Sequence, residues 1–367
     1  MSIDTLHIQH FRNITAAKLQ FHPRINLFFG ENGAGKTSVL EAISLLGRGR
    51  SFRSHKLKPL IQTDQPSVVV FGVIKAQGRA DKLGVERNRR SQDQFRLNGE
   101  AVGSAAELAK VLPVQSIYAD TFELITGGPG ERRQFLDWLV FHVEQQFFPA
   151  WQQVRRALKQ RNSLLRSGRI EASALAVWDS LLAKEAGLLD QCRQQAFTRF
   201  KDAFNALKGT VPALADLTLE YHRGWPADQN LVDVLQEGLD RDRASGYTLL
   251  GPHRADLRIR LNRAPAEEFL SRGQQKILAC ALKISAGQVF QQTTHRTCVY
   301  LLDDLPAELD EEHRQLLAQW LLALDAQIFV TGIDPGQLTG AWQALGVSFD
   351  LFHVEQGVIS KLEQNNG

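Results

Sequence analysis

An apolar segment followed at once by a glycine-rich loop constrains this chain more than any other feature. Residues 25–29 read INLFF, residues 30–37 read GENGAGKT, and Ser38 to Leu46 carry apolar side chains at helical spacing. A buried strand, a G-x-x-x-x-G-K-T loop and a helix in this order are typical of a site that binds the phosphates of a nucleoside triphosphate. The sequence therefore predicts an α/β fold built around a nucleotide.

Each part of this loop has an expected role. Backbone N–H groups of the loop are expected to converge on the phosphates. Lys36 is expected to reach the β- and γ-phosphates of ATP, and the Thr37 hydroxyl is expected to bind Mg²⁺. The predicted nucleotide-binding residues of this segment are Gly30, Glu31, Asn32, Gly33, Ala34, Gly35, Lys36, Thr37 and Ser38.

A second apolar segment, residues 298–302, ends in two carboxylates. Asp303 fits the acid that binds the metal ion, and Asp304 fits the residue that orients or deprotonates the attacking water. Strands often end at exposed acids, so this pair indicates a catalytic site only in combination with the upstream glycine loop. We predict that Lys36 and Asp304 are catalytic.

Residues 270–276, LSRGQQK, begin a predicted helix. Ser271 and Gln274 have the spacing of a capping box, which is a purely structural interpretation. The same helix start can present a serine hydroxyl and free N–H groups to a second phosphate. Both interpretations are compatible, and Ser271, Gly273 and Gln274 are therefore further candidates for nucleotide binding.

The remaining pattern separates β-rich from helical segments. Proline is absent between Pro149 and Pro212, and apolar residues recur at helical spacing from about 130 to 208. The Asn98-Gly99 pair predicts a tight hairpin turn. Other predicted strands are 6–8, 25–29, 68–74, 248–250, 257–261, 299–302, 328–330 and 349–354.

The loop, the serine-led helix and the acid pair, in this order, resemble the ATP-binding-cassette (ABC) ATPases. The resemblance implies an ABC-type head, with a mixed sheet and flanking helices, formed by residues 1–126 and 245–367. A mainly helical lobe, 127–244, would be inserted. It also implies a homodimer in which Ser271 of one subunit contacts ATP held by the glycine loop of the other.

Three further segments narrow the resemblance to the RecF family of bacterial repair ATPases, over residues 3 to about 362. These segments are FRN at 11–13, GGPGERRQFLD at 127–137 and GPHRADL at 251–257. The resemblance implies slow, DNA-stimulated ATP hydrolysis on gapped DNA or single/double-strand junctions, with RecO and RecR as partners in loading the recombinase. A transporter ATPase subunit, a phage-defence nuclease head and a non-catalytic DNA clamp are the alternatives.

The chain departs from the family pattern at two places. Residues 118–120 read YAD, where the family usually has proline before the acid, and Pro306-Ala307 replaces an alanine-serine pair. The second change leaves in doubt a hydroxyl contact across the dimer. Thr331 stands where transporter ATPases carry a histidine that senses the γ-phosphate. The resemblance also implies that Gln115 is the loop glutamine that completes the metal shell, with an ordinary exposed amide as the alternative.

Positive charge gathers in three clusters, although the formal net charge is only +3. The densest run is 48–58, from which we predict DNA contacts by Arg48, Arg50, Arg53 and Lys56. The second cluster comprises Arg87, Arg89, Arg90 and Arg96, and the third comprises Arg155, Arg156, Lys159, Arg161 and Arg166. A solvated charged surface is the alternative for each. Sequence-reading motifs are not evident, so contacts to the DNA backbone are expected.

Composition is that of an ordinary globular protein, with 43% hydrophobic and 23% charged residues among 367. Apolar runs are too short to span a bilayer, and the first residues lack the pattern of a signal peptide. The three cysteines are far apart and fit neither a disulfide framework nor a zinc site. We therefore expect a cytoplasmic protein with no membrane partner.

Overall fold

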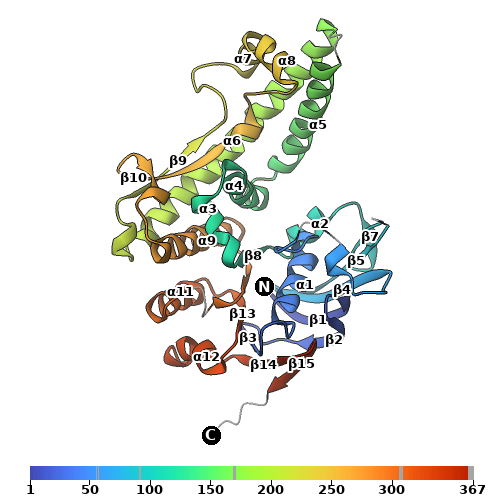
Figure 1. The fold of residues 1–367 in the computed structure, drawn as a ribbon, viewed down its shortest axis with the longest axis vertical. Helices are drawn as coiled ribbons and strands as arrows, with labels where there is room; N and C mark the ends of the chain where they lie inside the picture. Colours follow the sequence, from blue (N-terminus) through green and yellow to red (C-terminus); the bar gives the residue numbers. More distant parts are fainter. Residues whose placement is uncertain (55, 57, 91, 168–170, 306–308, 363–367) are drawn as a thin grey trace. The chain divides into compact units, whose positions relative to one another are not determined.

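A computed structural model describes the chain except residues 55, 57, 91, 168–170, 306–308 and 363–367. The chain forms two compact units (Figure 1). Unit 1 contains residues 1–121 and 290–367, and unit 2 contains residues 122–289. The two are described separately below.

Unit 1 contains two six-stranded sheets. The first is antiparallel, in the order β2-β1-β4-β5-β6-β7, and the second has the order β15-β14-β3-β13-β12-β8. In the second sheet β14, β3, β13, β12 and β8 are parallel, and only the edge strand β15 is antiparallel. This mixed sheet places the ends of its parallel strands along one edge.

The strands of unit 1 are β1 (Ser2–Phe11), β2 (Ile14–Gln20), β3 (Ile25–Phe29), β4 (Ser67–Ala76), β5 (Arg79–Asn88), β6 (Gln94–Leu97), β7 (Glu100–Val102), β8 (Val114–Ile117), β12 (Val299–Leu302), β13 (Gln327–Gly332), β14 (Asp350–Glu355) and β15 (Val358–Leu362). Its helices include α1 (Lys36–Arg48), α2 (Ala105–Val111), α11 (Glu311–Ala323) and α12 (Pro335–Ala344). Helix α1 packs against both sheets, and Leu40, Ile43 and Leu46 belong to the core between them. The helix that follows the glycine loop is therefore fixed along its length.

Unit 2 is mainly helical. Its helices include α3 (Glu123–Thr126), α4 (Pro129–Val143), α5 (Phe147–Arg166), α6 (Ala172–Lys208), α7 (Leu231–Glu237) and α8 (Leu239–Ser245). A three-stranded sheet, β11-β10-β9, consists of β9 (Leu217–His222), β10 (Asp256–Leu261) and β11 (Ala264–Pro265). Helix α9 (Arg272–Thr294) begins in unit 2 and ends within the residues of unit 1. Helices α5 and α6 lie side by side and enclose part of a separate apolar core (Figure 1).

Most predicted elements are present, and one predicted strand differs from the structure. Residues 248–250 form no strand. The compact units divide at 121/122 and 289/290 and group 245–289 with unit 2, while a head formed by 1–126 and 245–367 stays a prediction. The physical reason is that β10 pairs with β9, a strand inside the region predicted to be helical. The Asn98-Gly99 turn is confirmed, with both residues at positive φ between β6 and β7.

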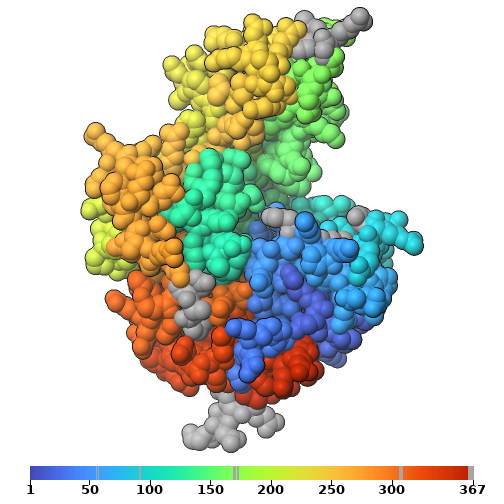
Figure 2. Space-filling view, in the orientation of Figure 1, coloured from blue at the N-terminus to red at the C-terminus, as the bar shows by residue number. Residues whose placement is uncertain are grey.

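The first and last segments of the chain belong together in unit 1. In the space-filling view their blue and red surfaces adjoin (Figure 2), and β14 near the end of the chain pairs with β3 near its start. Among the described residues, we find no helix long and apolar enough to cross a membrane.

Candidate nucleotide site

The candidate site lies where parallel strands of the mixed sheet end. The glycine loop follows β3, Asp303 follows β12, and Thr331 lies near the end of β13. The register aligns these ends, because Thr331 pairs with Phe28 and Leu302 pairs with Val330. Ligands of α/β proteins bind at such carboxyl edges.

Two glycines of the loop are required by backbone geometry. Gly30 has φ +150°, and a Cβ added there would lie 2.2 Å from the carbonyl oxygen of Val354. Gly35 has φ +117°, and its added Cβ would lie 2.9 Å from Nδ2 of Asn13. Any larger residue at either position would distort the loop, because L-residues with side chains rarely adopt these conformations.

Lys36 lies at the start of α1 with its ammonium group directed into the loop. Its Nζ donates to the carbonyl oxygens of Gly30 at 2.7 Å and Glu31 at 2.8 Å. Burial lowers the pKa of Lys36, while the nearby charges of Asp304 and Asp303 act in the opposite direction. These carbonyl contacts hold the ammonium group in place beside the loop.

Two hydroxyl groups meet on one carboxylate oxygen of Asp303. Thr37 and Thr331 each donate a hydroxyl hydrogen to Oδ1 of Asp303, both at 2.8 Å. Burial raises the pKa of Asp303, and the two hydroxyl contacts oppose this rise. The backbone N–H of Asp304 donates to Oγ1 of Thr331 at 2.8 Å, with Asp304 at φ 52°. A hydroxyl and a carboxylate at this spacing are the hard oxygen donors that Mg²⁺ prefers.

These residues surround one cavity of about 600 Å³. Its wall consists of Asn32, Gly33, Gly35, Lys36, Thr37, Ser38, Arg53, Tyr118, Ala119, Asp120, Asp303, Asp304 and Thr331. The structure thus brings the predicted loop, metal-binding acid and water-orienting acid together. The altered 118–120 segment forms part of the same wall.

Gln115 does not line this cavity. It is buried within β8, where it pairs with Tyr300 of β12, three residues before Asp303. Its Nε2 has no hydrogen-bond partner in the described part of the chain. A metal-binding role for Gln115 therefore stays a prediction. The residues after β8 that line the nucleotide cavity are Tyr118, Ala119 and Asp120.

Asn13 contacts the glycine loop, but it lies outside the G-x-x-x-x-G-K-T pattern, so that pattern could not identify it. Its Nδ2 donates to the carbonyl oxygens of Gly33 at 3.2 Å and Ala34 at 3.0 Å, and its Oδ1 accepts from the Ser38 hydroxyl at 3.0 Å. Asn13 therefore holds the loop from outside. The only sequence signal for it was the resemblance of the FRN segment.

The four basic residues predicted to contact DNA lie in different environments. Arg48 is half-buried at the end of α1, and burial, followed by the charge of Arg50, lowers its pKa to about 10. Arg50 and Lys56 are exposed. Arg53 lines the nucleotide cavity, where its charge opposes the raised pKa of Asp303. Positions 55 and 57 of this run, like Pro306-Ala307, lie outside the described residues.

The predicted capping box is present in unit 2. The backbone N–H of Ser271 donates to Oε1 of Gln274 at 2.9 Å, and the N–H of Gln274 donates to Oγ of Ser271 at 3.3 Å. Ser271 is exposed and Gly273 is half-buried, so this helix start is accessible. The structural interpretation is confirmed, and nucleotide binding here stays a prediction.

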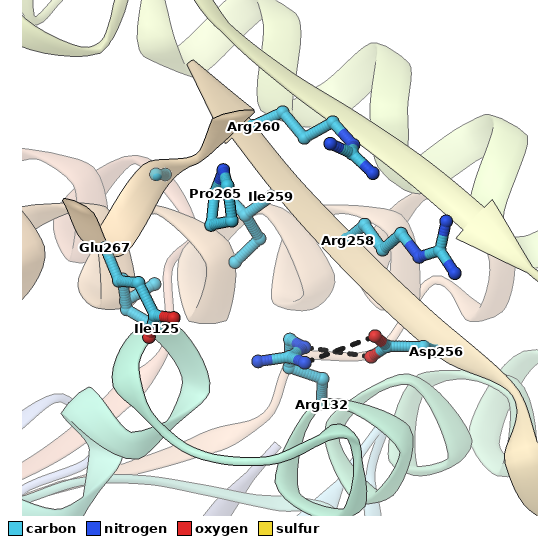
Figure 3. Close-up of a pocket in the computed structure, with 9 residues that line it drawn as sticks. Ile125, Arg132, Asp256, Arg258, Ile259, Arg260, Pro265 and Glu267 are labelled. Atoms are coloured by element: carbon cyan, nitrogen blue, oxygen red, sulfur yellow. Dashed lines mark hydrogen bonds and ion pairs between the residues drawn. The ribbon is translucent and has the colours of Figure 1, made fainter. Parts of the chain in front are cut away.

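Two of the segments that carried the family resemblance contact each other. Arg132 of the 127–137 segment forms a two-pronged ion pair with Asp256 of the 251–257 segment, at 2.8 and 3.2 Å (Figure 3). Arg133 donates to the carbonyl oxygen of Ala255 at 2.9 Å. A cavity of about 230 Å³ adjoins the ion pair. These segments therefore hold unit 2 together.

The third basic cluster is divided by burial. Arg161 is fully buried and pairs with Asp179 and Asp242, each at 2.6 Å. Arg155, Arg156, Lys159 and Arg166 are exposed on α5. Arg161 therefore has a structural role, and placing it with a DNA surface was wrong.

Comparisons with known proteins cover nearly the whole chain. The family model described as RecF/RecN/SMC N terminal domain matches residues 2–359. The "DNA replication and repair protein RecF" of Cellvibrio japonicus is 47% identical over 362 residues, covering 98% of this chain and 99% of that protein. The protein of the same name from Pseudomonas aeruginosa strain LESB58 is 46% identical, covering 98% of each.

A solved structure of the "recombination mediator protein RecF-ATP in RecFOR pathway" superposes with a TM-score of 0.88 at 26% identity. The match covers 99% of this chain and 98% of that one. An SMC head bound to the C-winged helix domain of ScpA has a TM-score of 0.59 at 14% identity, which shows a shared fold alone.

Proposed function

The chain belongs to the RecF family of DNA replication and repair proteins, and on this basis we propose that it is an ATPase of recombinational repair and replication-fork maintenance. Two copies would close around ATP on gapped DNA or at single/double-strand junctions, and would help RecO and RecR load the recombinase. Family membership favours this function over a transporter ATPase or a phage-defence nuclease. The observation that carries the proposal is the convergence of Lys36, Thr37, Asp303 and Asp304 on one cavity.

ATP would bind by exchanging contacts that the loop already makes. The ammonium group of Lys36 would leave the carbonyl oxygens of Gly30 and Glu31 for oxygens of the β- and γ-phosphates. Loop N–H groups and the start of α1 would hold the remaining phosphate oxygens. Arg53, in the wall of the same cavity, would add a further positive charge.

The donors present fit Mg²⁺, with Thr37 and Asp303 as the residues that would hold it. A bound Mg²⁺ would neutralise charge on the β- and γ-phosphate oxygens. Asp304 would orient the attacking water, because its backbone is fixed by the hydrogen bond to Thr331. Thr331 therefore links the metal-binding acid to the water-orienting acid.

The second copy would supply Ser271. The start of α9 is exposed, and its capping contacts come from Ser271 and Gln274 themselves, so both groups can turn to a phosphate. We propose that hydrolysis is slow because it requires this second copy. DNA would stimulate it by bringing copies together, and loss of the γ-phosphate would weaken the dimer.

Three variants test this mechanism by sedimentation velocity and ATPase rate, with and without gapped DNA. Asp304→Asn should bind ATP, hydrolyse it at least about a hundredfold more slowly and remain dimeric. Lys36→Met should lose both turnover and ATP-dependent dimerisation. Ser271→Arg should keep the ATP affinity of the single chain but lose turnover. Monomeric Asp304→Asn protein with ATP bound would refute the shared site.

A further inference from the structure

A second concave surface of unit 1 lies on the segment between α1 and β4. This basic groove has a volume of about 570 Å³ and is separate from the nucleotide cavity. It is lined by Arg12, Lys56, Lys58, Pro59, Ile61, Gln62, Thr63 and Arg89. Its residues come from the turn after β1, from Lys56 and the 58–63 segment, and from the turn after β5.

The 60–62 segment is attached to β1 by backbone contacts. Ile61 forms a β-bridge with Phe11, the N–H of Arg12 donates to the Leu60 carbonyl at 2.8 Å, and the N–H of Gln62 donates to the His10 carbonyl at 2.9 Å. Arg89 donates to the carbonyl oxygens of Gln65 at 2.8 Å and Gln62 at 3.1 Å. The floor of the groove is therefore preformed.

The groove carries positive charge that the described part of the chain does not neutralise. Its described lining residues include no acid, and Arg12 is the one cation among them that forms an ion pair, with buried Glu41. Within the same described residues, the Arg89 side chain donates to neutral carbonyl oxygens. The side chains of Lys56 and Lys58 are exposed, and within the described chain neither has a hydrogen-bond or ion-pair partner. An anionic ligand would meet three uncompensated cations.

The lining also indicates which anion fits. Surfaces that hold single strands combine cations with aromatic rings on which bases stack. Among the lining residues that the structure describes, the apolar side chains are Pro59 and Ile61, and none carries an aromatic ring. Contacts restricted to cations suit a phosphodiester backbone whose bases are already paired.

We propose that this groove binds the sugar–phosphate backbone of the duplex portion of DNA, an inference that rests on the proposed function. The predicted DNA-binding run then divides into two parts. Arg53 faces the nucleotide, while Lys56 and Lys58 contact DNA together with Arg89 of the second basic cluster.

The test uses Lys56→Gln/Lys58→Gln in the full chain, since both side chains are exposed and neither has a hydrogen-bond or ion-pair partner among the described residues. Lys18→Gln/Lys82→Gln is the matched control, because it removes the same charge from two exposed lysines of unit 1 that lie outside the groove. Affinities for a blunt duplex and a single strand of equal length are measured by fluorescence anisotropy at several salt concentrations.

The slope of log affinity against log salt should become shallower for the duplex by about 1.8, because each lost phosphate contact contributes about 0.9. The control pair should keep the wild-type slope, and ATPase activity without DNA should be unchanged in both variants. A duplex slope equal to that of the control overturns the groove assignment. A change confined to the single strand, or of equal size for both DNAs, overturns the assignment to duplex. Failure of the wild-type chain to bind either DNA would instead refute the proposed function.

Discussion

Replacing Arg161 by methionine should destabilise unit 2 more than any exposed substitution on the same helix. The guanidinium group is fully buried, and it contacts Asp179 and Asp242 at 2.6 Å each and Thr248 Oγ1 at 2.8 Å. Methionine fills most of the volume but leaves two buried carboxylates without a cation. Breaking a buried ion pair in this way costs about 3–5 kcal/mol.

Two controls separate the ion pairs from packing. Lys159→Met, on the exposed side of α5, should change stability by no more than about 0.5 kcal/mol. The triple variant Arg161→Met/Asp179→Leu/Asp242→Asn removes all three charges, and asparagine keeps an acceptor for the N–H of Leu249. Its stability should return to within about 1–2 kcal/mol of the wild-type value, because no uncompensated charge remains buried.

The loss should also depend on pH. Burial raises the pKa of Asp179 in the folded chain, and its contacts with Arg161 oppose that rise, so removing Arg161 should raise the pKa further. A carboxyl group whose pKa is higher in the folded chain than in the unfolded chain binds protons more readily when the chain is folded. The free energy of unfolding therefore falls as pH increases from the unfolded-state pKa through the folded-state pKa. The deficit of Arg161→Met should be larger at pH 7 than at pH 5.

The assay is hydrogen exchange of α5 and α6 amides followed by mass spectrometry. Exchange reports the free energy of local opening, which is suitable because a chain with two compact units need not unfold in one step. Wild-type protection in Arg161→Met, or equal loss in Lys159→Met, would refute the assigned role of the buried network.

Two further predictions concern the ATPase mechanism. Thr331→Val removes the hydroxyl that contacts Asp303 Oδ1 and the N–H of Asp304, and the loss of this alignment should lower kcat by about 10–100-fold with ATP affinity nearly unchanged. A wild-type rate constant for ATP hydrolysis in single-turnover assays would contradict that role of Thr331. Phe269 is 58% exposed two residues before Ser271, so a second copy that reaches Ser271 should cover its ring. Phe269→Ser should therefore weaken the ATP-dependent dimer roughly tenfold or more in sedimentation experiments, because a symmetric interface loses the ring twice. Val177→Ser, at a 64% exposed residue elsewhere in unit 2, is the control and should leave the dimer intact.

The parts of the nucleotide site that sequence could predict are those where chemistry fixes both residue type and local backbone. The glycine loop is one example, since Gly30 and Gly35 occupy conformations and spaces that exclude a side chain. The carboxylate after β12 is another, because a parallel strand delivers its last residues to the edge where the loop lies. Neither depends on knowing the rest of the fold.

The sequence pattern could not predict contacts between residues that are distant in the chain. Arg53 and Lys56 are three residues apart and each carries one positive charge, yet Arg53 lines the nucleotide cavity and Lys56 lines the basic groove. Arg161 has the spacing of a surface cluster but faces two acids from α6 and α8. Pairing of β9 with β10 carries residues 245–289 into unit 2, and no local signal reveals that pairing. In each case the partner lies far away in the chain.

The contact between the 127–137 and 251–257 segments also explains how the position of Ser271 is fixed. The chain that leads to it begins at Asp256, which Arg132 holds at the start of β10, and continues through β11 and a short turn into α9. Leu270, directly before Ser271, is buried, so the serine itself is left at the surface. Arg132 and Asp256 are therefore best understood as positioning residues. Their ion pair fixes the start of β10, the strand from which the chain continues to Ser271 at the start of α9.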